Sequence, residues 1–412
     1  MRGRDIEAVG ELAGEGSNVV TTLVRDMHAG IAGRVFGAIG PSSKPTQVIH
    51  DGIARTVYGT VDHGLRGATK AGGVLASQVW GRGDDEGLDS RGRVAGALAA
   101  VNGIYGHQLA SHRNGLALTM QIRQHGSVVP LSDESLSAAF PEATGRVAVF
   151  VHGWCLTERS WWRPPREGDT RSYGQRLAEN LGFTPIYLRY NTGLHISQNG
   201  QMLAGMLERL QRLWPVPIDE LVLVGHSMGG LVARSASFYG MQQHHWWTAA
   251  VRHVVCLGSP HLGADLEKGV NVAAWALGRL PETRALAGFL NRRSPGVKDL
   301  RYGAVIEEDW RDGDPDEFLR DRCHEVPFLP SAAYHFVATT VASPALGRLV
   351  GDCLVRSYSA TGTGRSRHIP FEADHGLTLT GLHHFDLLNH PQIYAKLREW
   401  VANAPKQIAA GR

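Results

Sequence analysis

The stretch ELVLVGHSMGGLVARSAS, residues 220–237, decides how the rest of the chain is arranged. Residues 221–224 form a continuous aliphatic run, which is typical of a strand buried on both faces of a parallel sheet. Apolar residues then recur at helical spacing through the second half of the stretch. The motif Gly225-x-Ser227-x-Gly229 therefore falls on the turn between a strand and a helix.

A serine on such a turn is the arrangement known as a nucleophile elbow. The turn is tight and strained, so small residues are needed on both sides of Ser227, and Gly225 and Gly229 supply them. Gly230 allows the following helix to approach the sheet closely. The motif alone is common by chance, but the strand before it and the helix after it favour a catalytic serine.

Strand-like and helix-like segments alternate on both sides of the elbow. The expected strands are 147–152, 184–190, 251–257 and 334–341, and the expected helices are 197–213 and 392–402. This alternation predicts an α/β fold with a mostly parallel central sheet and helices on both faces. Residues 116–131 alternate apolar and polar residues around His125-Gly126, which predicts a β-hairpin ahead of the parallel strands.

The length of 412 residues indicates a core with additions. We expect an N-terminal helical extension at 1–112 and a catalytic domain at 113–404, with a lid or cap insertion at about 264–330, where the alternation breaks down. The extension is rich in alanine, glycine and valine. Two interpretations remain open: it packs on the enzyme core, or it makes a peripheral contact with a membrane or another hydrophobic surface.

Composition excludes several classes of protein. The formal net charge of +3 is too small to indicate nucleic-acid binding, and no stretch has the pattern of a signal peptide or a transmembrane helix. Four cysteines without paired spacing favour reduced thiols, so we expect a cytoplasmic protein. Nothing in the sequence indicates an oligomeric state.

The chemistry of a serine nucleophile sets what must follow in the chain. A hydroxyl is a weak nucleophile at neutral pH and needs a general base, which in turn needs an orienting carboxylate. When the serine follows a central strand, the expected order is serine, then aspartate or glutamate, then histidine. The late candidates are Asp352, Asp374 and Asp386 for the acid, and His383 and His384 for the base.

Several motifs resemble those of α/β-hydrolases of the lipase and esterase kind, and most closely bacterial serine hydrolases with a GHSMGG elbow. The resemblance covers about 116–402. His152-Gly153-Trp154 is similar to the family's oxyanion turn, and HFDLL at 384–388 to its base motif. GDCLV at 351–355 resembles the family's Gly-Asp-Gly-Leu-Val acid loop, although Cys353 stands where the family has glycine.

The resemblance implies a role for each residue. Ser227 would attack an acyl carbonyl, His384 would carry the proton, and Asp352 would orient the imidazole. The backbone N–H groups of Trp154 and Met228 would form the oxyanion hole. The residues that support these motifs are His152, Gly153, Gly225, His226 and Gly229. His383 competes with His384 as the base, and Asp374 and Asp386 compete with Asp352 as the orienting acid.

The function implied by the resemblance is hydrolysis of a hydrophobic, lipid-like carboxylic ester through an acyl-enzyme, without metal or organic cofactor. The same triad would also serve an acyltransferase, a thioesterase or an amidase. From a different class, a hydrolase fold without catalysis would serve as a binding protein. Intact candidates for serine, aspartate and histidine argue against that last interpretation.

Overall fold

The computed structural model describes residues 92–264, 294–313, 321–340, 352, 354–364 and 367–403. Most of the expected N-terminal extension, 1–91, lies outside these residues. So do 265–293 and 314–320, which make up much of the expected lid. The expected boundaries of the extension, the catalytic domain and the lid therefore stay predictions.

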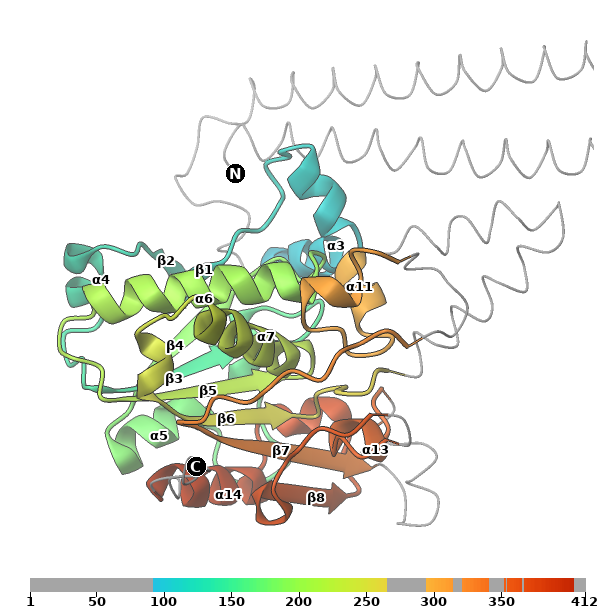
Figure 1. The fold of residues 1–412 in the computed structure, drawn as a ribbon. Coiled ribbons are helices and arrows are strands. Elements are labelled where there is room, and N and C mark those ends of the chain that lie inside the picture. Colours follow the sequence, from blue (N-terminus) through green and yellow to red (C-terminus); the bar gives the residue numbers. More distant parts are fainter. Residues whose placement is uncertain are drawn as a thin grey trace, which may run out of the picture.

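The described residues form one eight-stranded sheet, in the order β2-β1-β4-β3-β5-β6-β7-β8 (Figure 1). Strands β3 to β8 run parallel, and the β1–β2 hairpin joins the edge in antiparallel pairing. The strands are β1 (Gln121–Gln124), β2 (Ser127–Val129), β3 (Arg146–Val151), β4 (Thr184–Arg189), β5 (Glu220–His226), β6 (Val251–Leu257), β7 (Ala333–Thr340) and β8 (Gly376–Thr380).

Aliphatic residues in the central strands bury both faces of the sheet. Along β3, Val147, Val149 and Val151 belong to one core cluster, while Ala148 and Phe150 belong to another. Successive side chains of a strand point to opposite faces, so a buried strand needs apolar residues at every position. This is why the continuous runs in the sequence mark these strands.

Helices cover each face. Helices α6 and α7 pack in the first core cluster, and α5 and α14 pack in the second (Figure 1). The helices and 3-10 turns are α3 (Gly92–Ser111), α4 (Asp133–Ala139), η3 (Glu158–Trp162), α5 (Tyr173–Leu181), α6 (Ile196–Leu213), α7 (Met228–Gln242), α8 (Trp247–Ala250), α11 (Pro295–Asp299), η4 (Glu307–Asp309), α13 (Ser357–Ala360), η5 (Ala373–His375), η6 (His384–Leu388) and α14 (Pro391–Ala402).

The expected fold class is confirmed: the sheet is mostly parallel and helices lie on both of its faces. The predicted hairpin is also present, and its turn residues His125 and Gly126 both have positive φ. That pairing of angles is typical of a two-residue hairpin turn. Strand β8 and helix α5 are additions that the sequence patterns did not indicate.

Helix α3 is the described part of the expected N-terminal extension, and it packs against the core. The side chain of Asn102 is fully buried and donates to the carbonyls of Leu98 and Leu116. Its oxygen accepts a hydrogen bond from Leu118 N. Among the described residues, no helix combines the length and apolar character that a membrane crossing requires.

Candidate active site

The elbow is built as its sequence predicts. Ser227 lies between β5 and α7 with φ of 53° and ψ of −122°, a conformation that L-residues rarely adopt. Such strain costs about 1–3 kcal/mol and persists where surrounding structure holds it. Ser227 N donates to Leu257 O at 2.8 Å. A Cβ at Gly225 would overlap Gly230 N, and one at Gly229 would overlap Val151 O.

A histidine and an aspartate form a buried pair close to the elbow. Nδ1 of His384 lies 2.6 Å from Oδ2 of Asp352, and the two residues are 3% and 1% exposed. The other carboxylate oxygen accepts hydrogen bonds from the backbone N–H groups of Leu354 and Val355. A carboxylate at Nδ1 favours the tautomer that carries its proton there, which leaves Nε2 as an acceptor.

The imidazole of His384 packs over the ends of two adjacent strands. Its ring centroid lies 4.7 Å from that of His226, the residue before Ser227, and Nε2 of His226 donates to His384 O at 3.1 Å. A Cβ on Gly258, which follows β6, would lie 3.3 Å from the ring of His384. Burial lowers the pKa of His226 well below its ordinary value, so this histidine stays a neutral packing partner.

The competing residues lie elsewhere. His383 is exposed. Asp386 accepts from His383 N at 2.8 Å and pairs with Arg166 at 2.9 Å. Asp374 is 77% exposed and lies 3.9 Å from His375. Of the five candidates, the structure brings together His384 and Asp352.

The expected oxyanion turn follows β3 and borders the elbow. A Cβ on Gly153 would lie 3.1 Å from Cβ of Ser227. His152 is buried, and burial lowers its pKa to about 4, so its ring is neutral. Met228 is the first residue of α7, so its N–H has no acceptor within the helix.

Cys155 continues this turn with φ of 58°, an unfavourable conformation for cysteine. Its backbone N–H donates to Thr192 Oγ1 at 3.2 Å. Burial raises the pKa of its thiol to about 12, which disfavours the thiolate that a nucleophile needs. Among the described residues, Cys155, Cys256 and Cys323 are free thiols.

A buried ion pair secures the segment after the oxyanion turn. Glu158 begins η3, and its carboxylate binds the guanidinium of Arg189 on β4 through two hydrogen bonds, of 2.6 and 2.5 Å. Both side chains are 1% exposed. The sequence analysis missed this pair, and its only signal is a pair of charged residues beside apolar runs.

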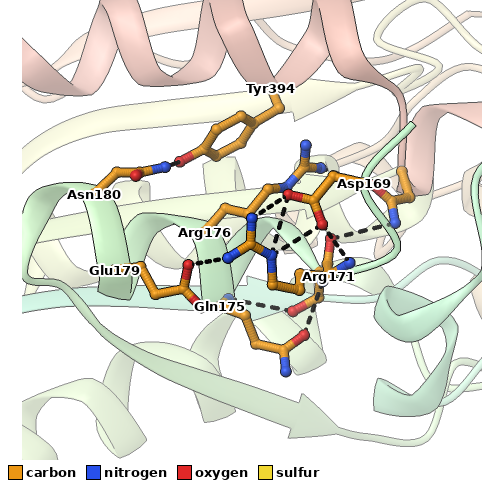
Figure 2. A network of polar contacts seen from close by, with 9 residues as sticks. Asp169, Arg171, Gln175, Arg176, Glu179, Asn180 and Tyr394 are labelled. Atoms are coloured by element: carbon orange, nitrogen blue, oxygen red, sulfur yellow. Dashed lines mark hydrogen bonds and ion pairs between the residues drawn. The ribbon is translucent and has the colours of Figure 1, made fainter.

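A second network secures the segment after the base (Figure 2). Arg176 on α5 donates to Asn389 Oδ1 at 2.7 Å, and its guanidinium stacks on Tyr394 of α14. The hydroxyl of Tyr173 donates to Leu387 O at 3.0 Å and accepts from His390 N at 2.8 Å. Helix α5 thus anchors residues 387–390, directly after His384.

The outer part of this network involves exposed charges. Figure 2 shows Arg171 between Asp169 and Glu179, the latter on α5. The side chains of Arg171 and Glu179 are each 50% exposed. Water screens such pairs, so the buried contacts of Tyr173 and Arg176 contribute more to the position of the base.

A cavity of about 440 Å³ opens beside the histidine–aspartate pair. His384, Asp352 and Leu354 line one part of it, and Arg163, Arg166 and Phe385 line another. Arg163 lies over the ring of Phe385 at 5.6 Å. The cavity therefore borders the His384–Asp352 pair, and Ser227 is not among the residues that line it.

Among the described residues, one group has the spacing of metal ligands. Ligand atoms of Glu372, Asp374 and His375 lie within 4.8 Å of one another. Both carboxylate residues are exposed, and His375 already lies near them as a salt-bridge partner. Exposed acidic residues often gather without a metal, so we assign no metal site here.

Comparison with known proteins agrees with this architecture. Residues 142–274, less than half of the chain, match the family model described as a PGAP1-like alpha/beta domain. This segment runs from the approach to β3 to beyond β6 and contains the elbow. The match covers the segment that holds the elbow, and the mostly parallel sheet around it is the α/β architecture that the motif resemblance implied.

One of the solved structures similar to this chain is the mature form of the lipase BlEst2 from Bacillus licheniformis. Its sequence is 20% identical, the match covers 62% of this chain and 91% of that chain, and the TM-score is 0.41. EstA from Clostridium botulinum has 13% identity over 64% of this chain and 88% of its own, with TM-score 0.36. Lipase B from Aspergillus fumigatus has 10% identity over 68% of this chain and 60% of its own, with TM-score 0.41. No curated protein matches the sequence.

Proposed function

We propose that this chain is a serine carboxylic ester hydrolase that acts on hydrophobic acyl esters through an acyl-enzyme. The observation that carries the proposal is the buried His384–Asp352 pair next to a strained serine at a strand-to-helix turn. A histidine oriented in this way is a general base, and an elbow serine is the group that such a base activates.

In the proposed first step, Ser227 Oγ adds to the carbonyl carbon of the ester while its proton passes to Nε2 of His384. The carbonyl oxygen becomes an oxyanion, which the N–H groups of Trp154 and Met228 stabilise. The carbon–oxygen bond of the ester then breaks, and the leaving alcohol takes the proton from His384. Water, activated by the same base, hydrolyses the acyl-enzyme and restores the serine.

Asp352 supports both steps from its buried position. Its carboxylate holds the imidazole in the tautomer that accepts at Nε2 and stabilises the imidazolium that forms. The two backbone N–H groups that bind its other oxygen keep the carboxylate fixed. The largely apolar stretch 270–280 within the expected lid favours a hydrophobic acyl group over a charged metabolite.

The decisive variant is Ser227→Ala. We expect kcat on short nitrophenyl esters to fall about a millionfold, since a triad without its nucleophile keeps little more than binding and oxyanion stabilisation. Ser137→Ala, on the exposed surface of α4, is the matched control and should keep wild-type activity. Full activity in Ser227→Ala would overturn the mechanism.

A serine-directed phosphonate provides an independent readout. It should label Ser227 alone, as mass spectrometry of the digested protein would show, and Ser227→Ala should remain unlabelled. A wild-type protein that resists labelling and hydrolyses no ester would instead favour the non-catalytic binding protein. Esters graded by acyl length, with thioesters, amides and an alcohol acceptor in parallel, would separate hydrolysis of esters from the alternative reactions of the same site.

A further inference from the structure

We infer that helix α3 positions the oxyanion turn, through the backbone carbonyl of Gly103 and the indole of Trp154. The inference rests on the proposed function, because it concerns where the Trp154 N–H points during catalysis. Gly103 and the Trp154 side chain are positioning residues in this scheme. The helix lies outside the alternating strand and helix segments, yet it touches the turn directly.

The contact is specific in its atoms. Nε1 of Trp154 donates to Gly103 O at 2.9 Å, and Sγ of Cys155 lies 3.8 Å from Ala100 O, one turn earlier in the helix. Gly103 makes this approach feasible. A Cβ at this position would overlap Cys155 Sγ and would lie 3.0 Å from Trp154 Nε1.

Helix α3 is itself held in place by hydrogen bonds, so it is able to hold the oxyanion turn in position. Asn102, the neighbour of Gly103, is buried and joins the helix to the chain at 116–118 through two hydrogen bonds. One turn later, Asn191 Nδ2 donates to Gly106 O at 2.9 Å. The loop that holds Asn191 also holds Thr192, whose hydroxyl accepts from Cys155 N.

The oxyanion turn needs such support because of its backbone. Cys155, directly after Trp154, has a φ of 58°, and strained residues keep their conformation only where their surroundings impose it. Contacts from α3 on one side and from Thr192 on the other supply that constraint. An oxyanion donor must lie within a narrow range of distance and angle, so a small relaxation of this turn reduces the rate.

The carbonyl of Gly103 accepts a second hydrogen bond, from Ser294 Oγ at 2.6 Å. Ser294 is fully buried and precedes α11, which packs beside α3 (Figure 1). One carbonyl therefore joins the oxyanion turn, the helix and the segment before α11. Loss of either donor leaves the other in place, so the two bonds are separable by mutation.

The test compares two glycines of the same helix. Gly103→Ala introduces a methyl group against Cys155, whereas a Cβ at Gly96 would meet nothing within 4 Å. We expect Gly103→Ala to lower kcat about 10- to 100-fold with KM within about 2-fold, as misplacement of a catalytic group does. Gly96→Ala should retain the wild-type values. Trp154→Phe, which loses the indole donor together with part of the ring, should show the same selective fall in kcat.

A second-site variant distinguishes positioning from general damage. Adding Cys155→Ala to Gly103→Ala removes the sulfur that the new methyl group meets, and we expect it to restore kcat to within about 5-fold of the Cys155→Ala single variant. A trifluoromethyl ketone, whose hemiketal oxyanion occupies the same hole, should bind Gly103→Ala and Trp154→Phe more weakly by the factor lost in kcat.

The outcomes separate this inference from the proposed function. An inactive wild-type protein would overturn both. If the wild-type protein is active and Gly103→Ala and Trp154→Phe have the same kcat as Gly96→Ala, the positioning role alone is overturned. A loss of activity that follows melting temperature, with KM and kcat affected together and no recovery on adding Cys155→Ala, would also overturn it.

Discussion

The two turns that meet beside Ser227 are held in different ways. The oxyanion turn and η3 rely on one fully buried ion pair, Glu158–Arg189, together with contacts from α3. The turn after His384 relies on several hydrogen bonds from α5, most of them between neutral groups. One side depends on few strong contacts, and the other on many weaker ones.

The difference has an energetic meaning. Removing one member of a buried ion pair leaves the other charge without compensation in a region of low dielectric, which is costly. Removing one of several neutral hydrogen bonds costs much less, because each contributes about 1 kcal/mol. We therefore expect one substitution on the oxyanion side to cost much more free energy of unfolding than one substitution on the histidine side.

The largest effect should come from the contact that belongs to the chemistry itself. Asp352→Asn keeps the shape of the side chain but favours the wrong tautomer of His384, so kcat should fall about 10,000-fold. Steady-state kinetics on a nitrophenyl ester would measure it. Asp374→Asn, in which an exposed carboxylate is lost, is the control and should change kcat less than about 2-fold. Equal effects in the two variants would refute the assignment of Asp352.

Next comes the ion pair on the oxyanion side. Glu158→Gln should lower the free energy of unfolding by about 3–5 kcal/mol, because Glu158 then no longer neutralises the buried charge of Arg189. Urea denaturation followed by circular dichroism would measure the loss. Glu220→Gln breaks the more exposed Arg146–Glu220 pair, and there we expect a loss of at most about 1 kcal/mol. If both variants lost the same free energy of unfolding, burial would not be the reason that the Glu158–Arg189 pair stabilises the fold.

The smallest effect should come from the histidine side. Tyr173→Phe removes the hydroxyl that bonds Leu387 O and His390 N, and we expect a loss of about 1–3 kcal/mol in the free energy of unfolding. Tyr394→Phe removes the hydroxyl that accepts the 2.7 Å hydrogen bond from Asn180, so its loss in free energy of unfolding should be the smaller of the two. If Tyr173→Phe lost more free energy of unfolding than Glu158→Gln, the turn after His384 would depend on single contacts more than the oxyanion turn does.

Much of the fold was predictable because burial leaves a pattern in the sequence. Strands β3 to β7 are buried, so their aliphatic runs stand out, and the predicted limits differ from the observed ones by a few residues at most. Strand β8 has the sequence GLTLT and is half exposed. Its apolar content is too low to distinguish it from a loop.

The contacts that hold the site were not predictable in the same way. Tyr173 and Leu387 are 214 residues apart, and Trp154 and Gly103 are 51 apart, in segments without a shared motif. The motifs predicted which residues would do the chemistry, whereas the residues that hold those segments in place become apparent only in three dimensions.

The hydrogen bond between His226 and His384 joins residues 158 positions apart, near the middle and the end of the folded core. The segments that form strands β6, β7 and β8 lie between the two histidines in the chain. Long-range contacts of this kind form late and slowly in folding. A chain still emerging from the ribosome therefore carries Ser227 before His384 has been made, and the contact between the two histidines marks a late stage of folding.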